Sequence, residues 1–248
     1  MSGAALRIED RDSFVLATLD RPEKRNAIDL DLIAALHELC ATLEAVPRTL
    51  VLQGAGANFA AGADIAQLRE RRADDARAGI NTRAFMRVHA LPMPVIAVLD
   101  GYALGGGAEL AYSADIRVGT HALHIGNPET GLGIIAAAGA TWRLRELVGE
   151  GLAAEMLLAG RVLTGEEAHA AGLITHLLPN GDDALAVAIT IAERIAKLDP
   201  AATQASKRVL RAPRNAHPEI DLAEQAVLFD SPEKERRMTA FLNRKQQR

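Results

Sequence analysis

The chain has 248 residues, of which 49% are hydrophobic and 24% charged, and its formal net charge is −4 at pH 7. This length and composition suit one large globular domain, or one domain with an appendage. Aromatic residues make up only 3%, and the slightly acidic balance lacks the basic face of a nucleic-acid-binding protein, so that class is excluded.

Strands and helices are predicted to alternate through most of the chain. Each expected strand is a short apolar run, and the clearest helix starts carry a side chain that can accept hydrogen bonds from free backbone N–H groups. Thr164 and Glu167 have the spacing of a capping box. The expected elements, in chain order, are a strand at 13–19, a helix from the N-cap Asp29 to Pro47, a strand at 49–53, a helix from about Asp64, a strand at 94–99, a glycine-rich turn at 101–107, a helix from about Ala108, a strand at 115–118, a helix from Thr164 to Gly172 and a strand at 174–178.

The pattern changes at about Asp183, beyond which helices dominate. The last helix is expected to begin at Ser231 as N-cap, with Pro232 in the first helical position. Strand–helix alternation followed by a helical tail indicates an α/β body with a C-terminal helical appendage. We therefore predict two parts, residues 1–190 and residues 191–248.

Several other classes of protein and site are excluded. A single cysteine, Cys40, rules out internal disulfides and cysteine-rich metal sites, and its apolar helical neighbours indicate a buried thiol. His121 and His124 match no standard metal-ligand spacing. Residues 1–10 do not resemble a signal peptide, and no stretch approaches the ~18 apolar residues of a membrane span. We expect a cytoplasmic protein without a metal site.

The most informative segment is the glycine-rich turn at 101–107, which Glu109 follows. Consecutive glycines between a strand and a helix let the backbone adopt conformations that side chains would block. The first N–H groups of the helix have no intrahelical partner, and with the helix dipole they favour developing negative charge. Glu109 lies close enough to act at the same place. A tight turn that serves only strand–helix packing is the alternative interpretation.

Two further segments could complete such a site. Residues 58–65 lead into small residues at a helix start and would present a second set of N–H groups, and an oxyanion hole requires two donors. Glu129 lies in a loop rich in glycine and proline, beside the apolar segment 134–139. Most isolated loop carboxylates are only solvated, but burial against apolar material would raise the pKa of Glu129 and let it act as a general acid.

Ordered motifs along nearly the whole chain resemble those of the enoyl-CoA hydratase/isomerase (crotonase) family. They are R-P-E-K-R-N-A at 21–27, F-A-A-G-A-D-I at 59–65, the strand–glycine–helix core at 94–118, and N-P-E-T-G-L-G at 127–133 with Arg143 and Leu144 beyond it. The resemblance implies an α/β spiral of repeated ββα units that carries an acyl-CoA site, at 1–190. It also implies C-terminal helices, at 191–248, that form a homo-trimer or a hexamer made of two trimers.

The resemblance also implies roles for particular residues. The backbone N–H groups of Ala63 and Gly106 would hold the oxygen of an acyl-CoA thioester. Contacts with the substrate and its CoA part are expected at Arg25, Ala27, Ala61, Asp64, Ile65, Ala66 and Gly105. No separate cofactor is expected, because coenzyme A is part of the substrate, and neither nucleic acid nor membrane is expected as a partner.

Two carboxylates fit the chemistry of water addition. Glu109 would activate the water, and Glu129 would donate a proton to the α-carbon, so the two would titrate as a coupled pair. Family members that only move a double bond usually need one acid/base, at the position of Glu129. Having both favours an enoyl-CoA hydratase that acts on trans-2-enoyl-CoA in fatty acid or related acyl-CoA metabolism. The alternatives are an isomerase or other acyl-CoA lyase of the family, and a non-catalytic acyl-CoA-binding protein.

The loop after Glu129 departs from the family pattern. Hydratases of the family commonly read I-P-G-A-G-G-T, whereas this chain reads I-A-A-A-G-A-T at 135–141. Ala137 stands where a glycine N–H is thought to position the water. The backbone N–H survives the change, which makes Ala137 the water-positioning candidate, but the added methyl could narrow the pocket.

Overall fold

The computed structural model describes residues 4–246. The chain divides into two compact units, Met1–Glu193 and Arg194–Arg248. All nine strands found in the described residues belong to the first unit. No helix in this part of the chain combines the length and the apolar character needed to cross a membrane.

The strands form two sheets. The larger has the order β1-β2-β3-β4-β6-β9 and is parallel except where β1 pairs with β2. The smaller has the order β5-β7-β8, with β5 and β7 parallel and β8 antiparallel to β7. The strands are β1 (Leu6–Asp10), β2 (Phe14–Leu19), β3 (Thr49–Gly54), β4 (Val95–Leu99), β5 (Tyr102–Leu104), β6 (Ile116–Thr120), β7 (His124–Gly126), β8 (Val162–Thr164) and β9 (His176–Leu178).

The first unit repeats one pattern: a strand of the larger sheet, then a strand of the smaller sheet, then a helix. β4 joins the larger sheet and β5 the smaller before α5 begins, and β6 and β7 repeat the pattern before α6 and α7. Isolated parallel bridges, from Ile28 to Ala63 and from Ala60 to Ala103, extend the pattern toward the N-terminus. The predicted α/β spiral of ββα units is confirmed.

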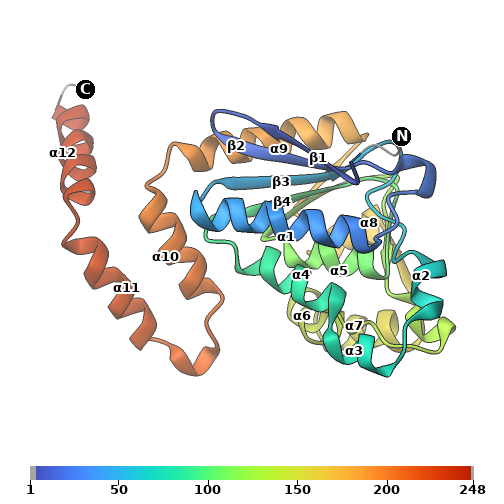
Figure 1. Cartoon of the computed structure of the whole chain (residues 1–248). Coiled ribbons are helices and arrows are strands. Elements are labelled where there is room, and N and C mark those ends of the chain that lie inside the picture. Colours follow the sequence, from blue (N-terminus) through green and yellow to red (C-terminus); the bar gives the residue numbers. More distant parts are fainter. Residues whose placement is uncertain (1–3, 247–248) are drawn as a thin grey trace. The chain divides into compact units, whose positions relative to one another are not determined.

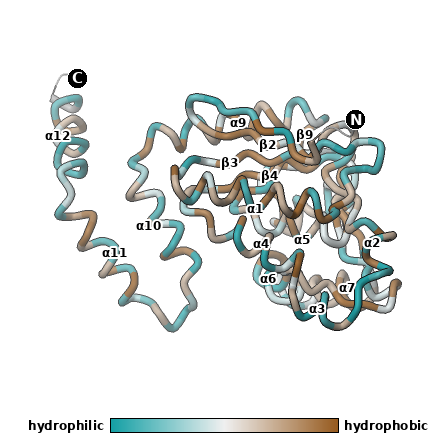
Figure 2. Tube along the Cα trace, in the orientation of Figure 1, coloured by the Kyte–Doolittle hydropathy of each residue, from teal (hydrophilic) through white to brown (hydrophobic). Residues whose placement is uncertain are grey.

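Helices follow these strands along the chain. Those that begin in the first unit are α1 (Leu30–Ala45), α2 (Ile65–Glu70), α3 (Ala73–Ala78), α4 (Ile80–Ala90), α5 (Gly106–Ser113), α6 (Ala140–Val148), α7 (Glu150–Leu158), α8 (Gly165–Ala170) and α9 (Gly181–Ala196). Figure 1 shows α1 on one side of the larger sheet and α9 on the other. Every residue of β2 and β4 is buried, as expected for strands covered on both faces. In Figure 2 the strands of the larger sheet are coloured mainly as hydrophobic.

The predicted caps and the strands of the large sheet agree well with the structure. Asp29 begins α1 by accepting a hydrogen bond from Leu32 N at 2.9 Å. Thr164 and Glu167 form the predicted capping box of α8. Cys40 is buried in α1. These features could be predicted because each depends on residues close together in sequence.

The segment after Asp64 differs from the prediction. The single expected helix is wrong, because the structure has α2, α3 and α4 there. Arg71 takes an extended conformation that ends α2, and Gly79, with a φ of +64°, separates α3 from α4. Residues 69–77 carry no apolar stripe that would hold one continuous helix against the core. The helix after the glycine-rich turn also begins earlier than expected, at Gly106.

The second unit is helical in its described part. It contains α10 (Pro200–Leu210), the 3-10 helix at Arg214–Ala216, α11 (Glu219–Phe229) and α12 (Pro232–Gln246). As predicted, Ser231 caps α12, accepting from Lys234 N at 3.2 Å. Arg208 and Glu224 join α10 to α11 through bonds of 2.7 and 2.6 Å. The exposed apolar side chains of this unit are Leu198, Leu210, Leu222, Val227, Phe229, Met238, Phe241 and Leu242.

Candidate active site

The glycine-rich turn connects three parts of the fold. Gly105, with a φ of +52°, lies between β5 and α5. Its N–H donates to Gly126 O at 2.9 Å, and its carbonyl accepts from Glu109 N at 3.0 Å. At Gly107 a Cβ would lie 2.1 Å from Ala60 O, so no larger residue fits there. The packing interpretation of the turn therefore holds for Gly105 and Gly107.

Gly106 is different, because a side chain there would make only ordinary contacts, and it lies beside a second unused donor. A Cβ on Gly106 would lie 3.7 Å from Ala63 N and 3.5 Å from Asn81 Nδ2, which are ordinary contacts. The bridge between Ile28 and Ala63 uses hydrogen bonds of the residues on either side of Ala63 and leaves its own N–H unused. Neither Ala63 N nor Gly106 N donates to any residue in the range 4–246. Two free backbone donors therefore border one small space.

Glu109 is one of two buried carboxyls beside this turn. It lies in the first turn of α5 with an exposed fraction of 4%. Its Oε1 accepts from Ala138 N at 2.6 Å and from Ala140 N at 3.2 Å. Burial raises the pKa of Glu109 to about 7, the backbone of residues 138–140 opposes the rise, and the charge of Glu129 adds to it. Glu109 thus changes its charge near neutral pH.

Glu129 is the second carboxyl, in the 3-10 helix at Pro128–Leu132, with an exposed fraction of 8%. Its Oε1 accepts from Asn127 Nδ2 at 3.3 Å and lies 3.2 Å from the position of a Cβ on Gly105. Its Oε2 is buried and accepts no hydrogen bond from the described residues. Burial raises the pKa of Glu129, as the sequence predicted. A buried oxygen without a donor is costly unless a proton or a ligand meets it.

Asn127 and Tyr112 were not predicted as part of the site. Asn127 is buried, and its Oδ1 accepts from the Tyr112 hydroxyl at 3.1 Å while its Nδ2 faces Glu129. Burial raises the pKa of Tyr112, so the hydroxyl remains a donor. The bond from Tyr112 orients the Asn127 amide so that its Nδ2 faces Glu129. The available sequence signals were an amide directly before the Pro-Glu pair and a tyrosine three residues after Glu109, on the same helix face.

Ala137 lies in the loop that holds Glu109. It is exposed, and its carbonyl accepts from Thr82 Oγ1 at 3.1 Å. Within residues 4–246 its N–H donates to no partner. The N–H groups that contact Glu109 belong to Ala138 and Ala140, which the sequence did not single out. The water-positioning role of Ala137 stays a prediction.

The residues predicted to contact CoA lie mainly around the start of α2. Arg25 is exposed in a left-handed conformation, and its carbonyl accepts from Ala61 N at 3.0 Å. Asp64 caps α2 by accepting from Ala66 N at 3.1 Å, and Ile65 is 59% exposed. Six of the predicted residues lie together in this region: Arg25, Ala27, Ala61, Asp64, Ile65 and Ala66. The seventh, Gly105, lies against Glu129 instead.

The arrangement can stabilise negative charge and move protons. Two free N–H groups lie close together, beside two buried carboxyls whose pKa values are both raised. Such groups suit a reaction in which an oxyanion develops while protons are transferred. Among the residues that the structure describes, no group of three or more His, Cys, Asp or Glu is placed to hold a metal ion.

Comparison with known proteins gives matches across the chain. The family model for enoyl-CoA hydratase/isomerase matches residues 9–248. The 2,3-dehydroadipyl-CoA hydratase of Escherichia coli is 36% identical over 90% of this chain and 88% of that protein. The short-chain-enoyl-CoA hydratase of Clostridium acetobutylicum is 31% identical over 96% and 94%.

Solved structures give the same result for the fold. The structure of an enoyl-CoA hydratase from Bacillus anthracis is similar with a TM-score of 0.91, at 28% identity, over 97% of this chain and 96% of that one. One from Thermoplasma volcanium has a TM-score of 0.88 and 34% identity, over 96% and 97%.

Proposed function

The chain belongs to the enoyl-CoA hydratase/isomerase family, which confirms the resemblance of its motifs, and on this basis we propose that it is an enoyl-CoA hydratase. It would add water across the 2,3 double bond of a trans-2-enoyl-CoA. The observation that carries the proposal is the pair of buried carboxyls, Glu109 and Glu129, in two different hydrogen-bonding environments. Relatives named as hydratases support it.

The first part of the proposed mechanism concerns the thioester oxygen. The free N–H groups of Ala63 and Gly106 border one space, so both can donate to an oxygen placed there. Attack of water at the β-carbon moves negative charge onto that oxygen. Fixed donors aimed at developing charge contribute about 3–4 kcal/mol each in comparable sites.

The second part concerns the proton transfers. Two backbone N–H groups bond Glu109 Oε1 and favour the ionised form, which suits a base that takes a proton from water. Glu129 Oε2 meets no donor, which suits an oxygen that carries a proton and gives it to the α-carbon. Burial raises both pKa values, but the two carboxyls differ in their hydrogen-bond partners, and this difference supports Glu109 as the base and Glu129 as the acid. The water would lie between them, near Ala137 N.

The CoA part of the substrate would lie around the start of α2. Arg25 and Ala66, both exposed, and the partly exposed Ala61 support this proposal, since Ala61 and Ala66 are close to Ala63 in sequence and Arg25 O accepts from Ala61 N. The two carboxyls and the backbone donors account for the reaction without a separate cofactor, and coenzyme A would enter only as part of the substrate.

The direct experiment follows the conjugated double bond. Purified protein should remove the ultraviolet absorbance of crotonyl-CoA, or of longer trans-2-enoyl-CoA thioesters, as the 3-hydroxy product forms. If the absorbance stays unchanged for every chain length, and a Glu109→Gln variant behaves identically, the hydratase proposal is wrong. Tight thioester binding without turnover would instead indicate an acyl-CoA-binding protein.

Gly106→Ala tests the oxyanion site separately from the fold. The new methyl meets no atom closer than 3.5 Å, so the variant should fold normally, but the methyl would lie 3.7 Å from Ala63 N, where the oxygen is expected. We expect kcat/KM to fall at least 10²-fold, on the scale of losing an oxyanion donor, with little change in Tm.

Gly107→Ala is the matched control for Gly106→Ala. Its methyl would collide with Ala60 O at 2.1 Å, so Tm itself should drop clearly. Wild-type activity in a folded Gly106→Ala variant would contradict the assigned oxyanion position.

We also propose that the second unit mediates assembly into a homo-trimer or a pair of trimers. Leu210 and Val227, 81% and 72% exposed, are two of its many solvent-facing apolar side chains, and contiguous exposed apolar surface commonly marks an interface. Light scattering on a size-exclusion column should give the mass of three or six chains. A monomer of 26.4 kDa at micromolar concentration would contradict this.

A further inference from the structure

Asn81 brings a polar group to the proposed thioester site. It lies in the first turn of α4, and its Nδ2 atom is 3.5 Å from the position of a Cβ on Gly106, beside Ala63 N. Its Oδ1 accepts from Arg71 Nη1 at 3.2 Å. Because a guanidinium can only donate, this bond fixes the amide so that Nδ2 faces Gly106.

The start of α4 also reaches the loop that holds Glu109. Thr82, the next residue, donates to the Ala137 carbonyl at 3.1 Å. The same turn of α4 therefore lies near Gly106 on one side and bonds the Glu109 loop on the other. The CoA contacts are expected at the start of α2, so this turn borders the space left for the acyl chain.

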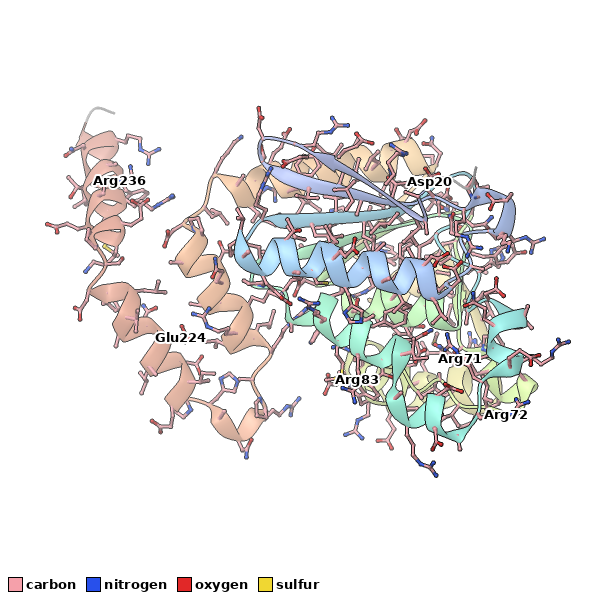
Figure 3. All side chains as sticks on the ribbon, viewed as in Figure 1. Asp20, Arg71, Arg72, Arg83, Glu224 and Arg236 are labelled. Atoms are coloured by element: carbon pink, nitrogen blue, oxygen red, sulfur yellow. The ribbon has the colours of Figure 1, made fainter. Side chains whose placement is uncertain are left out.

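Arg71 places an unpaired positive charge at this border. It is half-buried and bonds the neutral amide of Asn81, and it forms no ion pair with the residues that the structure describes. The nearby acids are engaged elsewhere: Glu70 with Arg69 and Asp74 with Arg77. Figure 3 labels Arg71 at the end of α2, together with Arg72, the next residue, and Arg83 in α4.

We propose that the acyl group bound by this enzyme carries a carboxylate beyond the reacting double bond, and that Arg71 binds that carboxylate. The inference rests on the proposed acyl-CoA site and names its substrate class. A partly desolvated guanidinium pairs with a carboxylate through strong, directional hydrogen bonds. Asn81 holds Arg71 one amide group away from the thioester position, a separation that a short acyl chain spans. A neutral acyl chain of equal length would leave the Arg71 guanidinium without an anionic partner.

Binding of saturated thioesters tests this without any turnover. Glutaryl-, adipyl- and pimelyl-CoA are titrated calorimetrically against the neutral pentanoyl-, hexanoyl- and heptanoyl-CoA of matched length. At least one dicarboxylic thioester should bind about tenfold or more tightly than its neutral match, as one charge-assisted pair implies. In Arg71→Met that preference should vanish while the affinity for the neutral series is kept.

Two variants complete the test. Arg72→Met removes the adjacent exposed arginine, which does not contact Asn81, and should keep the preference. Arg71→Lys keeps the charge and should restore part of it. Equal affinity for the two series, or equal effects of the Arg71 and Arg72 substitutions, would overturn the inference. A preference that depends on Arg71, in a protein that hydrates no enoyl-CoA, would support it while refuting the hydratase proposal.

Discussion

Glu129→Gln is expected to lower kcat for hydration by about 10²–10⁴-fold, the usual contribution of a general acid. Glutamine keeps the shape of the side chain and can still accept a hydrogen bond from Asn127 through its amide oxygen. It has no acidic proton to deliver from the position of Oε2, which meets no donor in the described residues. The loss should appear in kcat with a smaller change in KM, since the missing proton is needed only in the transition state.

Stopped-flow or steady-state absorbance with crotonyl-CoA measures the effect of Glu129→Gln, and Glu146→Gln is the matched control. Glu146 is exposed on α6, so its substitution should change neither rate nor Tm. A kcat for Glu129→Gln within a few-fold of wild type would remove Glu129 from the mechanism.

The glycine turn and the helix caps could be predicted because the relevant signals are local in sequence. The glycines before Glu109 must adopt conformations and close approaches that only glycine allows, as the φ of Gly105 and the 2.1 Å approach at Gly107 show. The caps at Asp29 and Thr164 likewise depend on residues three positions apart. Such features leave a recognisable pattern without knowledge of tertiary contacts.

The parts that could not be predicted depend on contacts between distant segments. Tyr112 and Asn127 meet because β7 pairs with β5 in a register that places Asn127 beside the start of α5. Arg71 meets Asn81 because the chain leaves the helical conformation after α2 and turns back at Gly79. The mixed charges at 69–77 are typical of a solvated helix face, and their composition cannot show that Arg71 bonds Asn81.

Glu109→Gln separates the two reactions open to this family. In a hydratase we expect it to lower kcat by about 10²–10⁴-fold, because the water loses its base. In an enzyme that only moves the double bond, Glu129→Gln would abolish turnover while Glu109→Gln would not. Assaying both variants with a 2-enoyl-CoA and a 3-enoyl-CoA tells the two apart.

The pH dependence of kcat/KM is a second, independent test of Glu109 as the base. Burial raises its pKa to about 7, and a base works in its ionised form, so kcat/KM should fall as the pH drops below about 7. Glutamine cannot titrate, so this acid limb should disappear from the residual activity of Glu109→Gln. An unchanged limb in the variant would assign the titration to another group.

Stability should change in the opposite direction from activity in Glu109→Gln. A carboxyl whose pKa rises from 4.5 to about 7 on folding binds its proton more tightly in the folded protein. Its stabilising effect is complete below pH 4.5 and is lost as the pH rises through about 7, where a charge must be buried. Glutamine carries no charge, so at pH 8 the variant should have a Tm no lower than wild type. An inactive variant of normal or raised Tm therefore identifies Glu109 as a residue kept for chemistry at a cost in stability.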